Sequence, residues 1–184
     1  MGWNWLGDHF ALDVANTVQL QRGTYAELIG SVTDLQNWAE LQGARVPEVI
    51  PADADVDTFR LTRDHILSLL RAVASSMGVP EESVEHIDDI ARRHPVTRRI
   101  DLGDGGGVGH VVGTTDPIES LRARAASALI DLLNGPDRDR LMLCEAPRCG
   151  QLFLQDRPNQ QWCCGACGNR ARAARHHAVK KGRS

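Results

Sequence analysis

Apolar residues recur at steps of three and four along much of the first 138 residues, which is the spacing of amphipathic helices. Four segments show this spacing, at 10–18, 33–42, 57–77 and 80–94. The third segment is the most regular and is long enough for about five helical turns. The hydrophobic pattern therefore predicts a mainly helical N-terminal part.

Residues that favour helix ends accompany this pattern. Thr33 and Gln36 have the spacing of a capping box, in which each side chain accepts from the backbone N–H of the other residue. Asp116 and Pro117 suit the N-cap and the first position of a further helix, and Asn-Gly-Pro at 134–136 suits its end. We expect Thr33 and Asp116 to act as helix caps.

One segment departs from the helical pattern. In residues 96–102, Val96, Ile100 and Leu102 fall on one face of an extended run, and a second apolar run follows at 108–112. The glycine-rich stretch between the two runs lacks the spacing of phosphate-binding loops, so we interpret it as a hairpin turn. The fold class that follows for this part is α+β, mainly helical with a small antiparallel β-hairpin.

Charge divides the 184-residue chain unevenly, although its net charge is only −3. Residues 1–139 carry 12 Lys and Arg against 22 Asp and Glu, a net −10, while residues 140–184 carry 9 against 2, a net +7. The turn-rich stretch 135–140 falls where the sign changes. We therefore predict two domains, at 1–138 and 139–184, and the basic second domain favours a polyanionic partner.

The chain shows no signal for membrane insertion or export. No apolar run approaches the roughly 18–20 residues that cross a bilayer, and the start MGWNWLGDHF lacks the basic and apolar blocks of a secretory signal. We expect a cytoplasmic protein with no membrane partner. Because a reducing compartment disfavours disulfides, clustered thiols there indicate metal binding or catalysis.

All five cysteines lie between 144 and 167, and four of them form two close pairs. Cys144-x4-Cys149 and Cys163-x3-Cys167 are separated by 13 residues, which is typical of a tetrahedral four-cysteine zinc site. Cys164 is an alternative third ligand, but we prefer Cys163 because it ends an apolar strand. Buried free thiols, or a Cys164–Cys167 redox pair, are the other interpretations. We predict one structural zinc ion per chain.

The residues around the cysteines predict a treble-clef-like zinc finger. We expect a strand at 151–154, a turn at 156–159, a returning strand at 160–162 and a helix from 169. A glycine follows the second cysteine of each pair. We expect both glycines to let backbone N–H groups approach the sulfurs.

The stretch Cys167-Gly168-Asn169-Arg170 is the CGNR signature, and with Cys144-x4-Cys149-Gly150 and Trp162-Cys163 it resembles the CGNR zinc-finger family. Residues 11–17, ALDVANT, look like the opening of the ABATE-type α/β domain that precedes this finger in bacterial stress-induced transcriptional regulators. The resemblance implies zinc ligation by Cys144, Cys149, Cys163 and Cys167, with Cys164 standing where the family has serine. It also implies DNA binding.

Basic residues concentrate beside the predicted metal site. The candidate nucleic-acid contacts are Arg148, Arg157, Arg170, Arg172, Arg175, Lys180 and Lys181. These positions spread over more than one face of a helix, so one groove of a duplex cannot receive them all. The alternative interpretation is a solvated helix whose charges complement the acidic body.

We predict a zinc-containing, DNA-binding transcriptional regulator and not an enzyme, because four thiolates close the zinc sphere. One finger makes a small interface, so we expect a homodimer through the N-terminal domain, which could also bind a small-molecule effector. Asp13 and Asn16 are interpreted as hydrogen-bonded residues, and His176 and His177 as surface residues. The alternative function is a zinc-stabilised protein-interaction or RNA-binding module.

Overall fold

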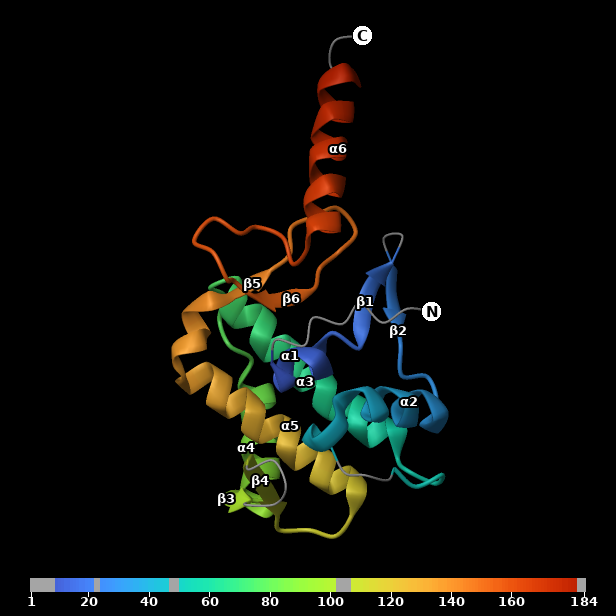
Figure 1. Cartoon of the computed structure of the whole chain (residues 1–184), viewed down its shortest axis with the longest axis vertical. Coiled ribbons are helices and arrows are strands. Elements are labelled where there is room, and N and C mark those ends of the chain that lie inside the picture. Colours follow the sequence, from blue (N-terminus) through green and yellow to red (C-terminus); the bar gives the residue numbers. More distant parts are fainter. Residues whose placement is uncertain (1–8, 22–23, 47–49, 102–106, 182–184) are drawn as a thin grey trace.

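The computed structural model describes residues 9–21, 24–46, 50–101 and 107–181, in a fold of helices and three two-stranded antiparallel sheets (Figure 1). The helices are α1 (Phe10–Ala15), α2 (Val32–Gln42), α3 (Val56–Ala74), α4 (Glu81–Arg93), α5 (Pro117–Asn134) and α6 (Gly165–Lys181), with short 3-10 turns η1 (Gly43–Arg45) and η2 (Pro136–Arg140). The strand pairs are β1 (Val18–Gln21) with β2 (Thr24–Glu27), β3 (Val96–Asp101) with β4 (Gly107–Val112), and β5 (Leu141–Leu143) with β6 (Leu152–Leu154). The predicted α+β, mainly helical class is confirmed.

The core of the body lies where α1, α3 and α5 cross (Figure 1). Phe59 and Ile66 of α3 are buried there, as the periodic pattern predicts. The Trp38 ring from α2 packs against that of Phe59, with centroids 5.5 Å apart, and closes one side of this core. Apolar spacing in the sequence thus identified the faces that become buried.

The first helix is shorter than predicted, because α1 ends at Ala15 and the chain then enters strand β1. Thr17 stops the helix by donating from Oγ1 to the carbonyl of Val14 at 2.8 Å. Its own carbonyl accepts from the N–H of Leu28 at 3.0 Å, which leads directly into the β1–β2 ladder. The apolar Val18 that extended the predicted helix is therefore the first residue of a strand.

The predicted cap of α2 at Thr33 is wrong, and Ser31 takes that position. Ser31 Oγ accepts from the N–H of Asp34 at 3.2 Å and donates to its carboxylate at 2.8 Å, so these two residues form the capping pair. The predicted cap at Asp116 is confirmed, since its carboxylate accepts from the N–H groups of Ile118 and Glu119 at 2.8 and 3.0 Å.

The predicted hairpin at 96–112 is confirmed, with Val96 opposite Val112. Residues 102–106 of its glycine-rich turn lie outside the described part of the chain. In the described ranges, no helix has the length and hydropathy that a membrane crossing requires.

The C-terminal sheet differs from the prediction. Strand β6 at Leu152–Leu154 was expected to pair with residues 160–162, but it pairs with β5 at Leu141–Leu143. Leu141 and Leu154 lie opposite each other and both enter the core of the body. Residues 160–162 could not replace β5 there, because two of the three are glutamines. From this sheet α6 points away from the body (Figure 1).

Candidate metal centre

Four cysteine side chains meet between the β5–β6 turn and the start of α6. The Sγ atoms of Cys144, Cys149, Cys163 and Cys167 all lie within 4.8 Å of one another, and three of the pairs are 3.5, 3.6 and 3.7 Å apart. A tetrahedral zinc ion with Zn–S bonds of about 2.3 Å would place its sulfurs about 3.8 Å apart. The spacing of the sulfurs therefore fits one zinc ion.

The first pair is presented by a tight turn between β5 and β6. The N–H of Cys144 donates to the carbonyl of Gln151 at 2.8 Å, which extends the strand ladder by one bond. Cys149 lies between Arg148 and Gly150, whose φ angles of 61° and 65° are both in the left-handed region. These two residues reverse the chain and direct both thiols to the same side.

The second pair is presented by the start of α6. The N–H of Cys163 donates to Cys144 Sγ at 3.4 Å, which joins the two halves of the site. Cys167 lies in the first turn of α6, where a helix N-terminus favours a thiolate. Arg170 Nη2 donates to Cys167 Sγ at 2.9 Å, and this bond offsets part of the negative charge of a thiolate.

The electrostatics of the four thiols favour a bound cation. Hydrogen bonds from the thiols of Cys149 and Cys163 lower the pKa of Cys144 to about 2. Burial, together with the neighbouring Cys149 and Cys144, raises the pKa of Cys167 to about 12. One thiolate thus suppresses ionisation of another, whereas a divalent cation would stabilise all four thiolates together.

Two family models match the chain and cover nearly all of it. Residues 140–180 match the CGNR zinc finger. Residues 8–136 match the ABATE family, described as "Putative stress-induced transcription regulator". The chain belongs to the ABATE family. That description is of a regulator and not of an enzyme, and no curated protein matches the chain.

This ABATE-family chain thus contains a CGNR zinc finger whose four grouped cysteines fit one structural zinc ion. The structure brings the sulfur of Cys163 into the group and leaves that of Cys164 outside it. Cys164 is half-buried and lines a surface pocket beside the group. In the described ranges, no other cluster of three or more His, Cys, Asp or Glu residues is arranged for a metal ion.

The two glycines that follow the cysteine pairs have different roles, and the expectation for the second is wrong. Gly150 has the positive φ that the turn requires. Gly168 lies inside α6, where its N–H donates to the carbonyl of Cys164 at 3.2 Å. A Cβ on Gly168 would lie 3.2 Å from Cε3 of Trp162, so this glycine provides room for the indole ring.

The predicted basic contacts do not share one face. Arg172 and Arg175 are exposed and lie three residues apart on α6, with the Arg175 guanidinium 5.7 Å from the centre of the Trp162 ring. Arg170 lies on roughly the opposite side of the helix, because two residues span a little more than half a turn. Arg148 and Arg157 are exposed on the two preceding loops.

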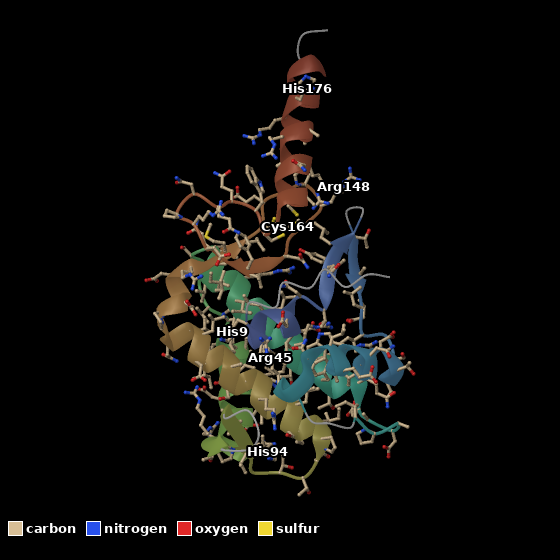
Figure 2. All side chains as sticks on the ribbon, viewed as in Figure 1. His9, Arg45, His94, Arg148, Cys164 and His176 are labelled. Atoms are coloured by element: carbon tan, nitrogen blue, oxygen red, sulfur yellow. The ribbon has the colours of Figure 1, made fainter. Side chains whose placement is uncertain are left out.

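The remaining predicted contacts lie toward the C-terminal end of α6. Figure 2 labels Arg148 near the base of α6 and His176, which is exposed, far along that helix. The side chains of His177, Lys180 and Lys181 lie outside the described residues.

Two buried polar residues make contacts between distant parts of the chain. Asn16 connects the body to the finger, and Arg63 connects α3 to strand β2. Asn16 was predicted to be hydrogen-bonded, and its partner is the backbone of Leu152 in β6. Arg63 was missed by the sequence reasoning, although its side chain is only 2% exposed and forms two bonds to the Glu27 carboxylate, at 3.0 and 2.6 Å. Its position in the α3 stripe, four residues after Phe59, was the available signal.

Asp13 also lies in this buried layer, and its carboxylate accepts from Arg45 Nη1 at 2.9 Å. The pairing supports its interpretation as a hydrogen-bonded residue.

Proposed function

We propose that this ABATE-family protein binds duplex DNA through α6, with the zinc site as the rigid base of that helix. The proposed ligands are Cys144, Cys149, Cys163 and Cys167. Four thiolates fill a tetrahedral coordination sphere and leave no position for substrate. The ion therefore has a structural role in this proposal, and the protein acts as a regulator and not as an enzyme.

The observation that carries the proposal is the projection of α6. The helix begins at the cysteine group and extends away from the body, and none of the other helices and strands that the structure describes lies beside its C-terminal half (Figure 1). Arg172, Arg175 and His176 are exposed along it. The major groove, about 12 Å wide, admits a helix of about 10–12 Å diameter. An unpacked basic helix on a rigid base has the shape and charge for that groove.

The charge distribution supports the same partner. Residues 1–139 carry a net −10 and residues 140–184 a net +7, so a polyanion would be attracted to the finger and repelled by the body. The two charges therefore orient the chain with α6 toward DNA.

The seven basic residues divide into two roles in this proposal. Arg157, Arg172 and Arg175 are the principal contacts, and Lys180 and Lys181 extend the contact along α6. Arg148 and Arg170 face other directions, so they add to the field that attracts DNA but do not enter the same groove.

We also propose that the protein works as a homodimer through its N-terminal domain, because a single small finger buries too little surface for specific affinity. A measurement of molecular mass by light scattering tests this.

The small-molecule effector is expected in a cavity of about 250 Å³ whose lining includes Phe10 of α1, Val96 of β3 and Ser127 of α5. Ligand-dependent thermal stabilisation that is lost in a Ser127→Trp variant would test that assignment.

Fluorescence anisotropy across a salt series tests DNA binding. The zinc-loaded protein is titrated against pooled duplex DNA and against duplex RNA of equal length. The five proposed contacts limit the slope of log K against log salt to about −4.5 per chain for DNA. Steep salt dependence with DNA preferred supports the proposal.

The alternative functions correspond to the other outcomes of that titration. Preference for the RNA would make the finger an RNA-binding module. Absence of binding to both polymers at low salt would make it a protein-interaction module and would overturn the proposal.

A further inference from the structure

A pocket of about 480 Å³ lies beside the four-sulfur group, between the loop 156–162 and the first turns of α6. We call it the Trp162 pocket, and its lining includes Arg157, Trp162, Cys164, Gly168 and Arg172. Cys164 is labelled at the base of α6 in Figure 2. The pocket is therefore on the finger, at the point where the projecting helix leaves it.

Hydrogen bonds within the loop hold one wall of the pocket in place. Gln155 Nε2 donates to the carbonyls of Pro158 and Gln160 at 3.2 and 3.1 Å. The N–H of Asp156 donates to Gln160 Oε1 at 2.9 Å. These bonds close the loop on itself without help from a ligand, so the wall is preformed.

The opposite wall depends on the second glycine of the finger. Because Gly168 has no side chain, the Trp162 ring packs directly against α6. The indole then forms an apolar surface inside the pocket.

The charged side chains of the pocket favour an anion. Arg157 and Arg172 contribute two guanidinium groups, and among the described residues that line the pocket Asp156 contributes the only carboxylate. Asp156 is paired outside the pocket with Arg140 Nη2 at 3.2 Å. Arg172 donates one N–H to Asn169 Oδ1, and a guanidinium has five donors in all. The balance of charge in the pocket is therefore positive.

We propose that the Trp162 pocket holds one backbone phosphate of duplex DNA, with Arg157 and Arg172 on its oxygens and the attached deoxyribose against the Trp162 ring. This inference rests on the proposed DNA binding and adds the residues that fix the position of α6 along the duplex. Arginine is well suited to phosphate because its planar fork can donate two bonds at once. Arg172 also belongs to the exposed face of α6 that carries Arg175. When this face lies in the major groove, the pocket is therefore at the edge of the groove, where the phosphates lie.

Salt dependence distinguishes one shared phosphate from two separate ones. We compare Arg157→Gln, Arg172→Gln and the double variant with Arg92→Gln, a control exposed on α4 of the body. Each neutralised phosphate contributes about 0.9 to the slope of log K against log salt. If both arginines hold the same phosphate, the double variant loses about 1 unit of slope, while each single variant binds DNA several-fold more weakly. Zinc content and helicity must stay at the wild-type values.

The other outcomes overturn the inference in distinguishable ways. Loss of about 2 units in the double variant would mean two separate phosphates and no shared pocket. Unchanged slopes in these variants, with steep wild-type binding, would remove the pocket but keep the proposed function. Absence of wild-type binding would remove both.

Inorganic phosphate tests whether the ligand is free phosphate instead. At constant ionic strength, the DNA-free protein should bind free phosphate only weakly, so replacing millimolar chloride with phosphate should raise its melting temperature little. Saturable stabilisation by micromolar phosphate that disappears in Arg157→Gln would assign the pocket to a free phosphate ligand and would overturn the DNA phosphate.

Discussion

The side chain of Asn16 is hydrogen-bonded twice to the backbone of Leu152, 136 residues later in the chain. Asn16 Nδ2 donates to the Leu152 carbonyl at 2.9 Å, and its Oδ1 accepts from the Leu152 N–H at 3.1 Å. Both bonds are buried, and they fix strand β6 of the zinc finger against the end of α1 in the body. The finger is thus attached to the body by a specific polar contact as well as by leucines.

Replacing Asn16 with Ala should destabilise the whole protein. The change leaves the N–H and the carbonyl of Leu152 buried without partners, at about 1–3 kcal/mol each. We expect the free energy of unfolding in urea to fall by about 3 kcal/mol. Asn134→Ala is the matched control, because it removes an exposed bond to the carbonyl of Ile130 and should cost less than about 1 kcal/mol. Equal losses in the two variants would contradict the role of the contact.

Zinc removal should loosen the body as well as the finger. Leu141, Leu152 and Leu154 of the β5–β6 sheet belong to the same hydrophobic core as α3, so unfolding of the finger withdraws apolar surface from that core. For a chain of this size, each kcal/mol of stability lost on zinc removal should lower the melting temperature by about 2–4 °C. Hydrogen exchange should accelerate in α1 and α3 after chelation and recover when zinc is restored. Acceleration confined to residues 141–167 would show instead that the finger unfolds alone.

The ion pair between Arg63 and Glu27 should make stability depend on pH. Burial opposes ionisation of Glu27, but hydrogen bonds from Arg63 and the Ile29 N–H outweigh it and lower its pKa below the usual 4.5. A carboxylate with a lowered folded-state pKa stabilises the protein above its unfolded pKa, and this contribution is lost as pH falls through the folded value. Glu27→Gln should therefore be less stable than the wild type at pH 7, and the difference should shrink below about pH 4.5. A difference independent of pH would rule out this ion pair as the cause.

Gly168→Ala should disturb the finger although alanine favours helices by about 1 kcal/mol over glycine. The new Cβ would lie 3.2 Å from the Trp162 ring, and the ring would have to move. We expect lower stability and a changed Trp162 fluorescence. Gly165→Ala is the control on the same helix, because its Cβ would meet nothing within 4 Å. Similar behaviour of the two variants would show that Gly168 is not required for ring packing.

Local signals in the sequence were sufficient to predict many of the helices and the metal site. Caps such as Asp116 act over three residues, and apolar spacing reports burial directly, so most helices were predicted within a few residues. The spacing of the cysteines predicted the metal site because a four-thiolate sphere needs two close pairs. These features depend on neighbours in the chain.

Features that depend on distant residues were missed or misassigned. The partner of β6 is β5, which follows a charged turn, and the pairing is stabilised by burial against the body rather than by a local turn signal. Arg63 was overlooked because a buried arginine depends on Glu27 and Thr17, 36 and 46 residues away. The role of Gly168 depends on the position of the Trp162 ring, which the glycine itself does not reveal.

We propose that α6, held by the zinc site, is the surface that contacts DNA. The most direct test places a photo-crosslinking amino acid at His176, exposed on α6, and in a separate variant at Arg92, exposed on α4. With zinc bound, irradiation in the presence of duplex DNA should crosslink the position 176 variant, and chelation or high salt should abolish the product. Crosslinking from position 92 at an equal yield, or none from position 176 under conditions where DNA is bound, would contradict the account.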